Sequence, residues 1–337
     1  MSHLNDYDKI ANALTYIDAH DRGTWVKMGM AVKSELGEGG FELWRDWSVK
    51  ASNYKEKDAI AKWKSFKPEG GTKIGTLFHE AKAGGWKSTE AYEKRSRAEE
   101  LAIKVARAKA EKESAQQEKE RHTLAAGEAS KQWGSAIPAL ASHPYCKHKS
   151  IPPIGARQDK DGNLLIPLFD QSGKLASVQT ISPCGKKKRF TTGSKVSGCS
   201  LTLKGKEDGR VLLCEGWATG CTLHKTFGST VIVAFSAHNL ASAAQKLDKE
   251  LPYSHSITVC GDVDESGAGQ KAAEAAARQI NLHIHNSFLY FPSFTAEENE
   301  AWAARNNGDL PSDFNDYVAI GKTLNDSDFL AVSKGVL

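Results

Sequence analysis

The sequence is poor in the features that mark secreted, metal-stapled or membrane proteins. Its six cysteines form no Cys-x-x-Cys pair, which argues against a disulfide framework or a structural zinc site. No apolar run approaches the ~20 residues that a membrane-spanning helix needs. The first residues, Met1–Asp8, carry no basic region followed by an apolar one, so no signal peptide is visible. These absences predict a cytoplasmic protein with no membrane partner.

Length and composition bound what remains. A chain of 337 residues is too long for one ordinary core, so two or three domains are expected. A hydrophobic content of 40% and a charged content of 26% are ordinary for globular proteins. The net charge of +4 is too small to indicate a nucleic-acid partner by itself. The distribution of charge along the chain is more informative.

Residues 1–92 predict an all-helical domain. Apolar residues recur at helical spacing in segments separated by Gly or Asn, namely Tyr7–Ile17, Thr24–Leu36, Gly40–Lys50, Lys55–Ser65 and Ile74–Gly84. Five of the eight tryptophans lie in this domain, and we expect them to fill its core. The alternative is that nucleic-acid bases stack on them. Residues 93–133 follow as a charged connecting helix, because fifteen of the twenty-eight residues from Lys94 to Arg121 are charged.

Residues 134–209 predict a small, basic α+β subdomain. Short strand-like runs at Leu164–Phe169, Leu175–Ile181 and Lys188–Thr192 are separated by turn residues. A run of charges is more often a solvated turn than a binding site. Beside a metal-binding domain, however, cations are expected to hold nucleotide phosphates or a DNA backbone. The candidate nucleotide- and DNA-binding residues are Lys149, Arg157, Lys186, Lys187, Lys188, Arg189 and Lys195.

Residues 210–337 alternate between strand and helix patterns. The expected strands are Val211–Cys214, Thr230–Phe235, Ser256–Cys260 and Ser287–Phe291, with helical patterns between them. Strands without polar alternation, joined by helices, predict a parallel sheet with helices on both faces. The fold class is therefore α/β in this part of the chain.

Three carboxylates follow two of these strands. Glu215 comes directly after the first, and Asp262 and Asp264 follow the third. Chemistry in open α/β sheets gathers at the carboxyl ends of the strands, and carboxylate oxygens are the ligands that Mg²⁺ prefers. If the third strand continued, the side chains of Asp262 and Asp264 would point to the same side. An Asp-x-Asp pair alone is weak evidence, but a preceding strand-Glu-Gly makes the pattern more specific.

This pattern resembles a known family. Glu215-Gly216 followed by Asp262-Val-Asp264 is similar to the Toprim domain shared by bacterial-type primases, topoisomerases and certain nucleases. Further stretches are similar to the region ahead of Toprim in phage- and plasmid-encoded primases: His143–Lys149, Leu164–Asp170, Gly173–Gln179 and Gly185–Phe190. In the amino-terminal domain, Trp25–Ala31, Phe41–Ser48 and the stretch from Trp63 to Phe78 resemble the small helical domain called primase C-terminal 2 (PriCT-2).

The resemblance implies a DNA primase, a nucleotidyltransferase that makes short RNA primers on single-stranded DNA from NTPs in phage or plasmid replication. It assigns Glu215, Asp262 and Asp264 as catalytic and metal-binding, with Mg²⁺ as the ion and Mn²⁺ as a substitute. It adds Asp313 and Asp316 to the acidic pocket. Without the resemblance, Asp313 would be read as a helix N-cap and Asp316 as a solvent-exposed carboxylate.

Other interpretations stay open from sequence alone. A Toprim-type nuclease would use the same acids to cut phosphodiesters, and a catalytically silent protein would bind nucleic acid as a replication accessory. No Gly-x4-Gly-Lys-Ser/Thr motif occurs, so the partner expected for unwinding is a separate replicative helicase or replication protein. No zinc is expected, because His143, Cys146 and His148 lack a second ligand pair at useful spacing.

Overall fold

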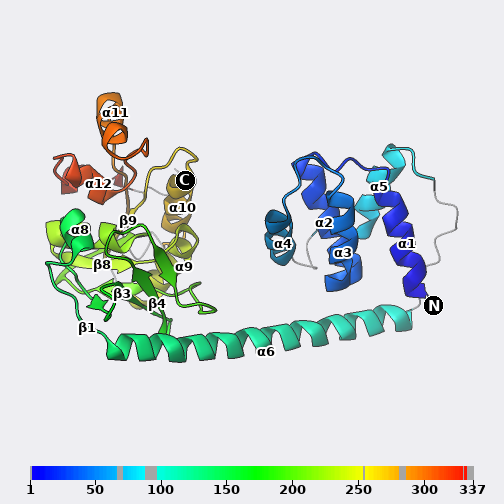
Figure 1. Ribbon diagram of the computed structural model, residues 1–337, viewed down its shortest axis with the longest axis horizontal. Helices are drawn as coiled ribbons and strands as arrows, with labels where there is room; N and C mark the ends of the chain where they lie inside the picture. The colour runs from blue at the N-terminus through cyan, green and yellow to red at the C-terminus, as the bar shows by residue number, and fades with distance from the viewer. Residues whose placement is uncertain are drawn as a thin grey trace. The chain divides into compact units, whose positions relative to one another are not determined.

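The computed structural model describes residues 2–66, 71–87, 97–252, 255–280, 286–328 and 330–331 (Figure 1). The chain divides into two compact units, Met1–Glu113 and Ser114–Leu337. The boundary lies within the long helix α6 (Arg97–Ser135), which covers most of the expected connecting helix. None of the helices in the described part of the chain combines the length and the apolar character that crossing a membrane requires.

The first unit is helical, as predicted. Its elements are α1 (Ser2–Leu14), α2 (Arg22–Leu36), the 3-10 turn η1 (Gly37–Gly40), α3 (Phe41–Ser48), α4 (Glu56–Ser65) and α5 (Ile74–Ala83). Four of its tryptophans are buried, and Trp44 is inaccessible to solvent. Each buried indole N–H finds a partner, such as Glu38 for Trp63 at 2.8 Å. The tryptophans therefore form the core of this unit, with Trp25 packed against it.

The second unit contains two sheets. The first sheet is antiparallel and follows chain order, β1 (Ile137–Pro138), β2 (Arg157–Gln158), β3 (Leu164–Phe169), β4 (Leu175–Ile181) and β5 (Lys188–Phe190). The short helix α7 (Pro144–His148) lies between β1 and β2 in sequence. The strands β3 and β4 have the predicted bounds. The end of α6 covers this sheet, because Ala129, Ala136 and Trp133 pack against Leu165 and Val178.

The second sheet has the order β11-β10-β9-β7-β8-β6. Its strands are β6 (Leu201–Leu203), β7 (Lys206–Cys214), β8 (Ser229–Val233), β9 (Ser256–Cys260), β10 (Asn286–Tyr290) and β11 (Leu330–Ala331). The four central strands are parallel, which confirms the predicted α/β class. The outer strands β6 and β11 pair in the antiparallel sense and were not predicted.

Helices cover both faces of this sheet (Figure 1, green to orange). Residues of α8 (Trp217–Phe227) and α12 (Phe314–Ala319) pack in one core cluster, and residues of α9 (Ala237–Glu250) and α10 (Ala268–Ala277) pack in another. The helix α11 (Ala296–Arg305) has no buried residue and does not contribute to either cluster. Successive strand residues point to opposite faces. Leu212 and Cys214 pack in the cluster that contains α8, whereas Val211 and Leu213 pack in the cluster that contains α9 and α10. Burial on both faces explains why the strands read as continuous apolar runs.

The connections reverse direction at the middle of the sheet. From β7 the chain passes through α8 to its neighbour β8, and then through α9 to β9 on the other side of β7. The next connection, through α10 to β10, continues away from β7. The switch point therefore lies between β7 and β9. In open α/β sheets, ligands bind in the crevice outside the carboxyl ends of the strands at this point.

Candidate active site

Glu215 and Asp262 leave the sheet at the switch point. Cys214 and Cys260 are register partners on the parallel strands β7 and β9. Glu215 therefore follows the end of one strand and Asp262 lies two residues beyond the end of its neighbour. Main-chain hydrogen bonds hold the backbone where the chain leaves each strand. The Phe235 N–H donates to the Glu215 carbonyl at 2.8 Å, and the Val263 N–H donates to the Ser312 carbonyl at 2.8 Å.

Asp262 has the most unusual surroundings of the predicted acids. Among the residues that the structure describes, its Oδ1 atom is buried and has no hydrogen-bond partner. Burial is the first cause that raises the pKa of Asp262, to about 8. The negative charges of Asp313, Glu215, Asp316 and Asp264 raise this pKa further, in that order. The five predicted acids therefore interact electrostatically around Asp262.

Glu215 is partly buried beside this cluster. Burial raises its pKa, and the charge of Asp264 raises it further. The Ala237 backbone N–H, at the start of α9, and the nearby His238 act in the opposite direction. The Ala237 N–H and His238 therefore offset only part of the cost of burying the Glu215 charge.

Asp264 differs from Asp262, although only one residue separates them. The strand β9 ends at Cys260 and does not continue through Asp262 and Asp264, so strand geometry does not place their side chains on one side. The Asp264 side chain is exposed, and it accepts hydrogen bonds from the Ser266 hydroxyl and from the Gly269 N–H at 2.7 Å. These bonds, Ser266 first, lower the pKa of Asp264 to about 2. Asp264 thus holds the loop that leads into α10, while its remaining lone pairs stay open to other donors or cations.

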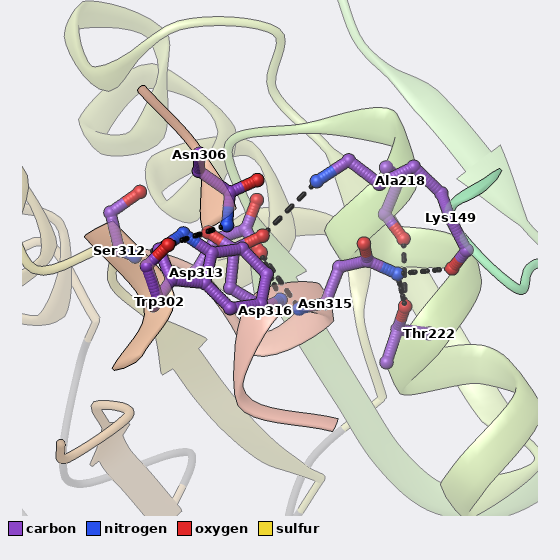
Figure 2. Close-up of polar contacts among 9 residues, drawn as sticks. All are labelled: Lys149, Ala218, Thr222, Trp302, Asn306, Ser312, Asp313, Asn315 and Asp316. Atoms are coloured by element: carbon purple, nitrogen blue, oxygen red, sulfur yellow. Dashed lines mark hydrogen bonds and ion pairs between the residues drawn. The ribbon is translucent and has the colours of Figure 1, made fainter. Parts of the chain in front are cut away.

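Asp313 and Asp316 are both used by α12 (Figure 2). Asp313 is its N-cap, as the reading without the family suggested, and accepts from the N–H groups of Asn315 and Asp316 at 2.8 and 2.9 Å. Burial raises the pKa of Asp313, and Asp316 raises it further against the opposing charge of Lys149. The Asp316 side chain is only 10% exposed, so it is not the solvent carboxylate of that reading. It accepts from the Lys149 ammonium and the Ser312 N–H, both at 3.1 Å.

The acids do not form a ready-made metal cage. Within the described ranges, no group of three or more His, Cys, Asp or Glu side chains is placed to hold an ion. The reason is visible in the hydrogen bonds, because Asp264, Asp313 and Asp316 each serve a local partner. Asp262 retains an oxygen without a hydrogen-bond partner, and the Glu215 carboxylate is close enough to raise the pKa of Asp262. A buried carboxylate without a donor is costly unless a cation accompanies it. This chemistry fits Mg²⁺, which takes one or two carboxylates and completes its shell with water and phosphate.

Two predicted cations lie beside the acids. Lys149 contacts Asp316, and Lys188 interacts with Asp313, Asp316 and Asp262. Desolvation of the ammonium and the charge of Lys149 lower the pKa of Lys188, although its side chain as a whole is exposed. The Lys188 ammonium lies 5.7 Å from the centre of the Tyr145 ring.

The remaining predicted cations have other surroundings. Lys186, Lys187, Arg189 and Lys195 are exposed. Arg157 is held by α6, because its guanidinium donates to the Trp133 carbonyl at 2.7 Å and lies 4.5 Å from the centre of the Trp133 ring. This contact engages the guanidinium within the fold, and the predicted binding of nucleotide or DNA by Arg157 stays a prediction.

Other residues build the site without carrying a formal charge, and of these Asn315 was not singled out from the sequence. Asn315 joins α12 to Lys149 and α8. Trp217 stacks on Tyr145 at 6.3 Å and donates its indole N–H to the Ile154 carbonyl at 3.0 Å. The only sequence signal for Asn315 was its place in the Asp313–Asp316 stretch. His143 caps α7 and lies 2.7 Å from the Gly162 carbonyl.

Two segments of the chain match known families. Residues 10–81 match the family model for primase C terminal 2 (PriCT-2), and residues 210–322 match the model for a Toprim domain. Two curated relatives are DNA primase TraC proteins from Escherichia coli. One is 28% identical over 213 residues, which cover 59% of this chain and 14% of that protein. The other is 26% identical over 231 residues, which cover 65% and 20%.

Solved structures give a weaker likeness. The primase fragment of the bacteriophage T7 primase-helicase protein aligns with a TM-score of 0.32 at 16% identity, over 51% of this chain and 71% of that one. A DNA primase domain from Pseudomonas aeruginosa aligns with a TM-score of 0.33 at 15% identity, over 57% and 79%.

Proposed function

Because the chain carries a PriCT-2 region and a Toprim domain of the kind found in phage- and plasmid-type primases, we propose that it is a DNA primase. The proposed reaction is Mg²⁺-dependent synthesis of short RNA primers from NTPs on a single-stranded DNA template. The aligned segments span at most 20% of the TraC relatives, so the activity is a proposal for this chain that its own site must also support.

The observation that supports this proposal most strongly is the buried, unpartnered oxygen of Asp262. It lies at the switch point of a parallel sheet, with Glu215 at the end of the adjacent strand. Asp262 and Glu215 would hold the ion, with Asp264 at the edge of the cluster. Bound there, Mg²⁺ would offset the negative charge of the nucleotide phosphates. Mn²⁺ has the same preference for oxygen ligands and is the proposed substitute.

The chain's own cations have a complementary role. Lys149 contacts Asp316, and Lys188 is close enough to interact electrostatically with the acids. Both would contact the phosphates of a bound nucleotide. The exposed Lys186, Lys187, Arg189 and Lys195 would bind the backbone of the template strand. Cations beside carboxylates distinguish a site for polyphosphate from a simple acidic surface. Template unwinding is proposed to come from a helicase supplied outside these 337 residues, in which no P-loop motif occurs.

One incubation tests the proposal. Labelled NTPs, single-stranded DNA and Mg²⁺ or Mn²⁺ are combined with the wild-type chain, and the products are separated by size. Short RNA that disappears with Asp262→Asn and with Glu215→Gln, while Arg157→Lys retains it, supports a primase. Shortened DNA identifies a Toprim nuclease instead, and the lack of either product identifies a nucleic-acid-binding protein without this activity.

Glu215→Gln also separates chemistry from folding. Glu215 makes no ion pair within the described residues, and burial raises its pKa. A neutral side chain of the same shape should therefore leave the melting temperature nearly unchanged while primer synthesis is lost. A large drop in melting temperature would mean that Glu215 is structural and would withdraw its catalytic assignment.

A further inference from the structure

Asn315 is a buried amide whose two donors both point to other elements (Figure 2). The residue is 4% exposed. Its Nδ2 atom donates to the Lys149 carbonyl at 2.7 Å and to the Thr222 hydroxyl oxygen at 2.9 Å. The Thr222 hydroxyl in turn donates to the Ala218 carbonyl at 3.1 Å. The amide therefore ties α12 to α8 and to the end of α7.

Lys149 is held by α12 at both of its ends. Asn315 binds its main-chain carbonyl, and Asp316, the next residue of α12, binds its ammonium at 3.1 Å. Lys149 is the C-cap of α7, and the following residue, Ser150, has a positive φ of 53°. The Lys149 N–H still donates to the Tyr145 carbonyl at 3.0 Å, and the Ser150 N–H donates to the Lys147 carbonyl at 3.1 Å. The Lys149 carbonyl, in contrast, accepts from Asn315, so Asn315 links this end of α7 to α12.

Holding a lysine in one place requires such contacts. A free lysine side chain loses about 2 kcal/mol of rotamer entropy when it is fixed. The Lys149 side chain is 23% exposed, so it is only partly enclosed and its ammonium can still meet a ligand. Its charge opposes the rise in the pKa of Asp313 and contributes to the fall in the pKa of Lys188. The ammonium therefore contacts the acidic cluster at Asp316 and is close enough to Lys188 of β5 to act on it electrostatically.

A purely structural role would require less specific chemistry. An apolar side chain of similar volume would fill the space between α12 and α8 without buried donors that must be satisfied. The hydrogen bond to Thr222 does serve that packing. The hydrogen bond to Lys149 instead sets a backbone whose side chain faces the acids.

We propose that Asn315 is a positioning residue, which sets the Lys149 ammonium at the edge of the acidic cluster so that it meets the phosphates of an incoming nucleotide. The phosphate contact rests on the proposed primase function. The positioning of Lys149 itself does not, and the two can be measured separately.

The test compares Asn315→Leu with two other variants. Asn315→Leu keeps the branched arrangement of four side-chain heavy atoms and removes both donors. Thr222→Val keeps the shape of Thr222 and removes the second acceptor of Asn315 together with the hydroxyl donor to Ala218, but it leaves the Lys149 contact in place, so it is the matched control. Lys149→Met removes the cation on which Asn315 is proposed to act. If Asn315→Leu does not fold, Asn315→Ser replaces it, because the short serine side chain cannot span the contact to Lys149.

The first measurement needs no nucleotide. Competitive acetylation followed by mass spectrometry reports how exposed and how free each lysine amine is. Asn315→Leu should raise the labelling of Lys149 several-fold, and Thr222→Val should leave it unchanged. Unchanged labelling in Asn315→Leu would overturn the positioning role and leave Asn315 as a helix-packing residue.

The second measurement is primer synthesis at varied NTP concentration. Loss of one well-placed cation should raise KM for NTP about tenfold in Asn315→Leu, with kcat within about twofold of wild type. The double variant with Lys149→Met should be no worse than Lys149→Met alone, because both changes remove the same contact. Additive effects, or an unchanged KM, would overturn the phosphate role. If the wild-type chain makes no primers, the proposed function fails, and the labelling result still decides the positioning role.

Discussion

Replacing Asp262 with Asn should make the protein more stable at neutral pH while it abolishes primer synthesis. The folded pKa of about 8 lies above the ordinary value of 3.8, so the fold favours the protonated acid. The contribution of Asp262 to stability is therefore fully present below the ordinary pKa. It is lost as the pH rises towards the folded pKa. Asn does not titrate, so the variant loses this pH dependence.

The size of the effect follows from the two pKa values. At pH 7 the unfolded chain has an ionised Asp262, whereas the folded chain keeps it mainly protonated. The difference spans about three pH units at about 1.4 kcal/mol each, so it is on the order of 4 kcal/mol. The advantage of Asp262→Asn over wild type should grow by up to this amount between pH 4 and pH 7. A gain of 1 kcal/mol corresponds to about 2–4 °C in melting temperature for a unit of this size.

Denaturant unfolding of both proteins across this pH range measures the difference. Taking the change in the difference cancels any constant effect of the substitution on packing. A second arm adds Mg²⁺, which should stabilise the wild type by about 2.7 kcal/mol at a hundred times its dissociation constant and should leave Asp262→Asn unaffected. Parallel pH curves would refute the reasoning, because they would mean that Asp262 ionises in the fold without cost.

Three further predictions concern the loop, the helix contact and the basic turn. Asp264→Asn should lower the melting temperature at neutral pH. Calorimetry should find that this difference from wild type disappears as the pH falls from about 4 to about 2, because the folded pKa of Asp264 is about 2. An equal difference at every pH would contradict the assigned hydrogen bonds. Arg157→Ala should cost about 1–2 kcal/mol of unfolding free energy through its lost Trp133 contact, with primer synthesis retained; the reverse pattern would place Arg157 at the substrate. Changing Lys186 and Lys187 to Gln should weaken the salt dependence of single-stranded DNA binding. The slope of the logarithm of the binding constant against the logarithm of the salt concentration should become shallower by about 0.7 for each lost phosphate contact. An unchanged slope in a salt titration would mean that these lysines do not contact the template.

Patterns of apolar and turn residues in the sequence predicted the strands whose ends are set by neighbouring residues. Strands β3, β4 and β9 have the predicted bounds because apolar runs end at turn residues on both sides. Strands β6 and β11 were missed because they have three and two residues. Their pairing with β8 and β10 depends on contacts that are distant in sequence. A pattern of two or three residues has no measurable period.

The candidate site was predictable to a similar extent. The parallel-strand rule placed Glu215 and Asp262 at neighbouring strand ends, and the register of β7 and β9 agrees. Their catalytic and metal-binding roles remain predictions. The sequence could not separate Asp262 from Asp264, because the difference depends on where β9 ends and on which loop atoms reach each carboxylate. The partners of Lys149 and Arg157 also come from helices far away in the chain.

The main chain beside Glu215 has a further consequence. Phe235 has a φ of 65°, which a bulky residue adopts only when its surroundings impose it. Its N–H binds the Glu215 carbonyl, and its buried ring meets Phe190 of the antiparallel sheet edge-on at 6.2 Å. One of the contacts that accompany this conformation therefore comes from the antiparallel sheet. The main-chain corner at Glu215, a predicted catalytic residue, is therefore tied to the antiparallel sheet, and a segment excised without residues 134–209 would lack the Phe190 ring that packs on it.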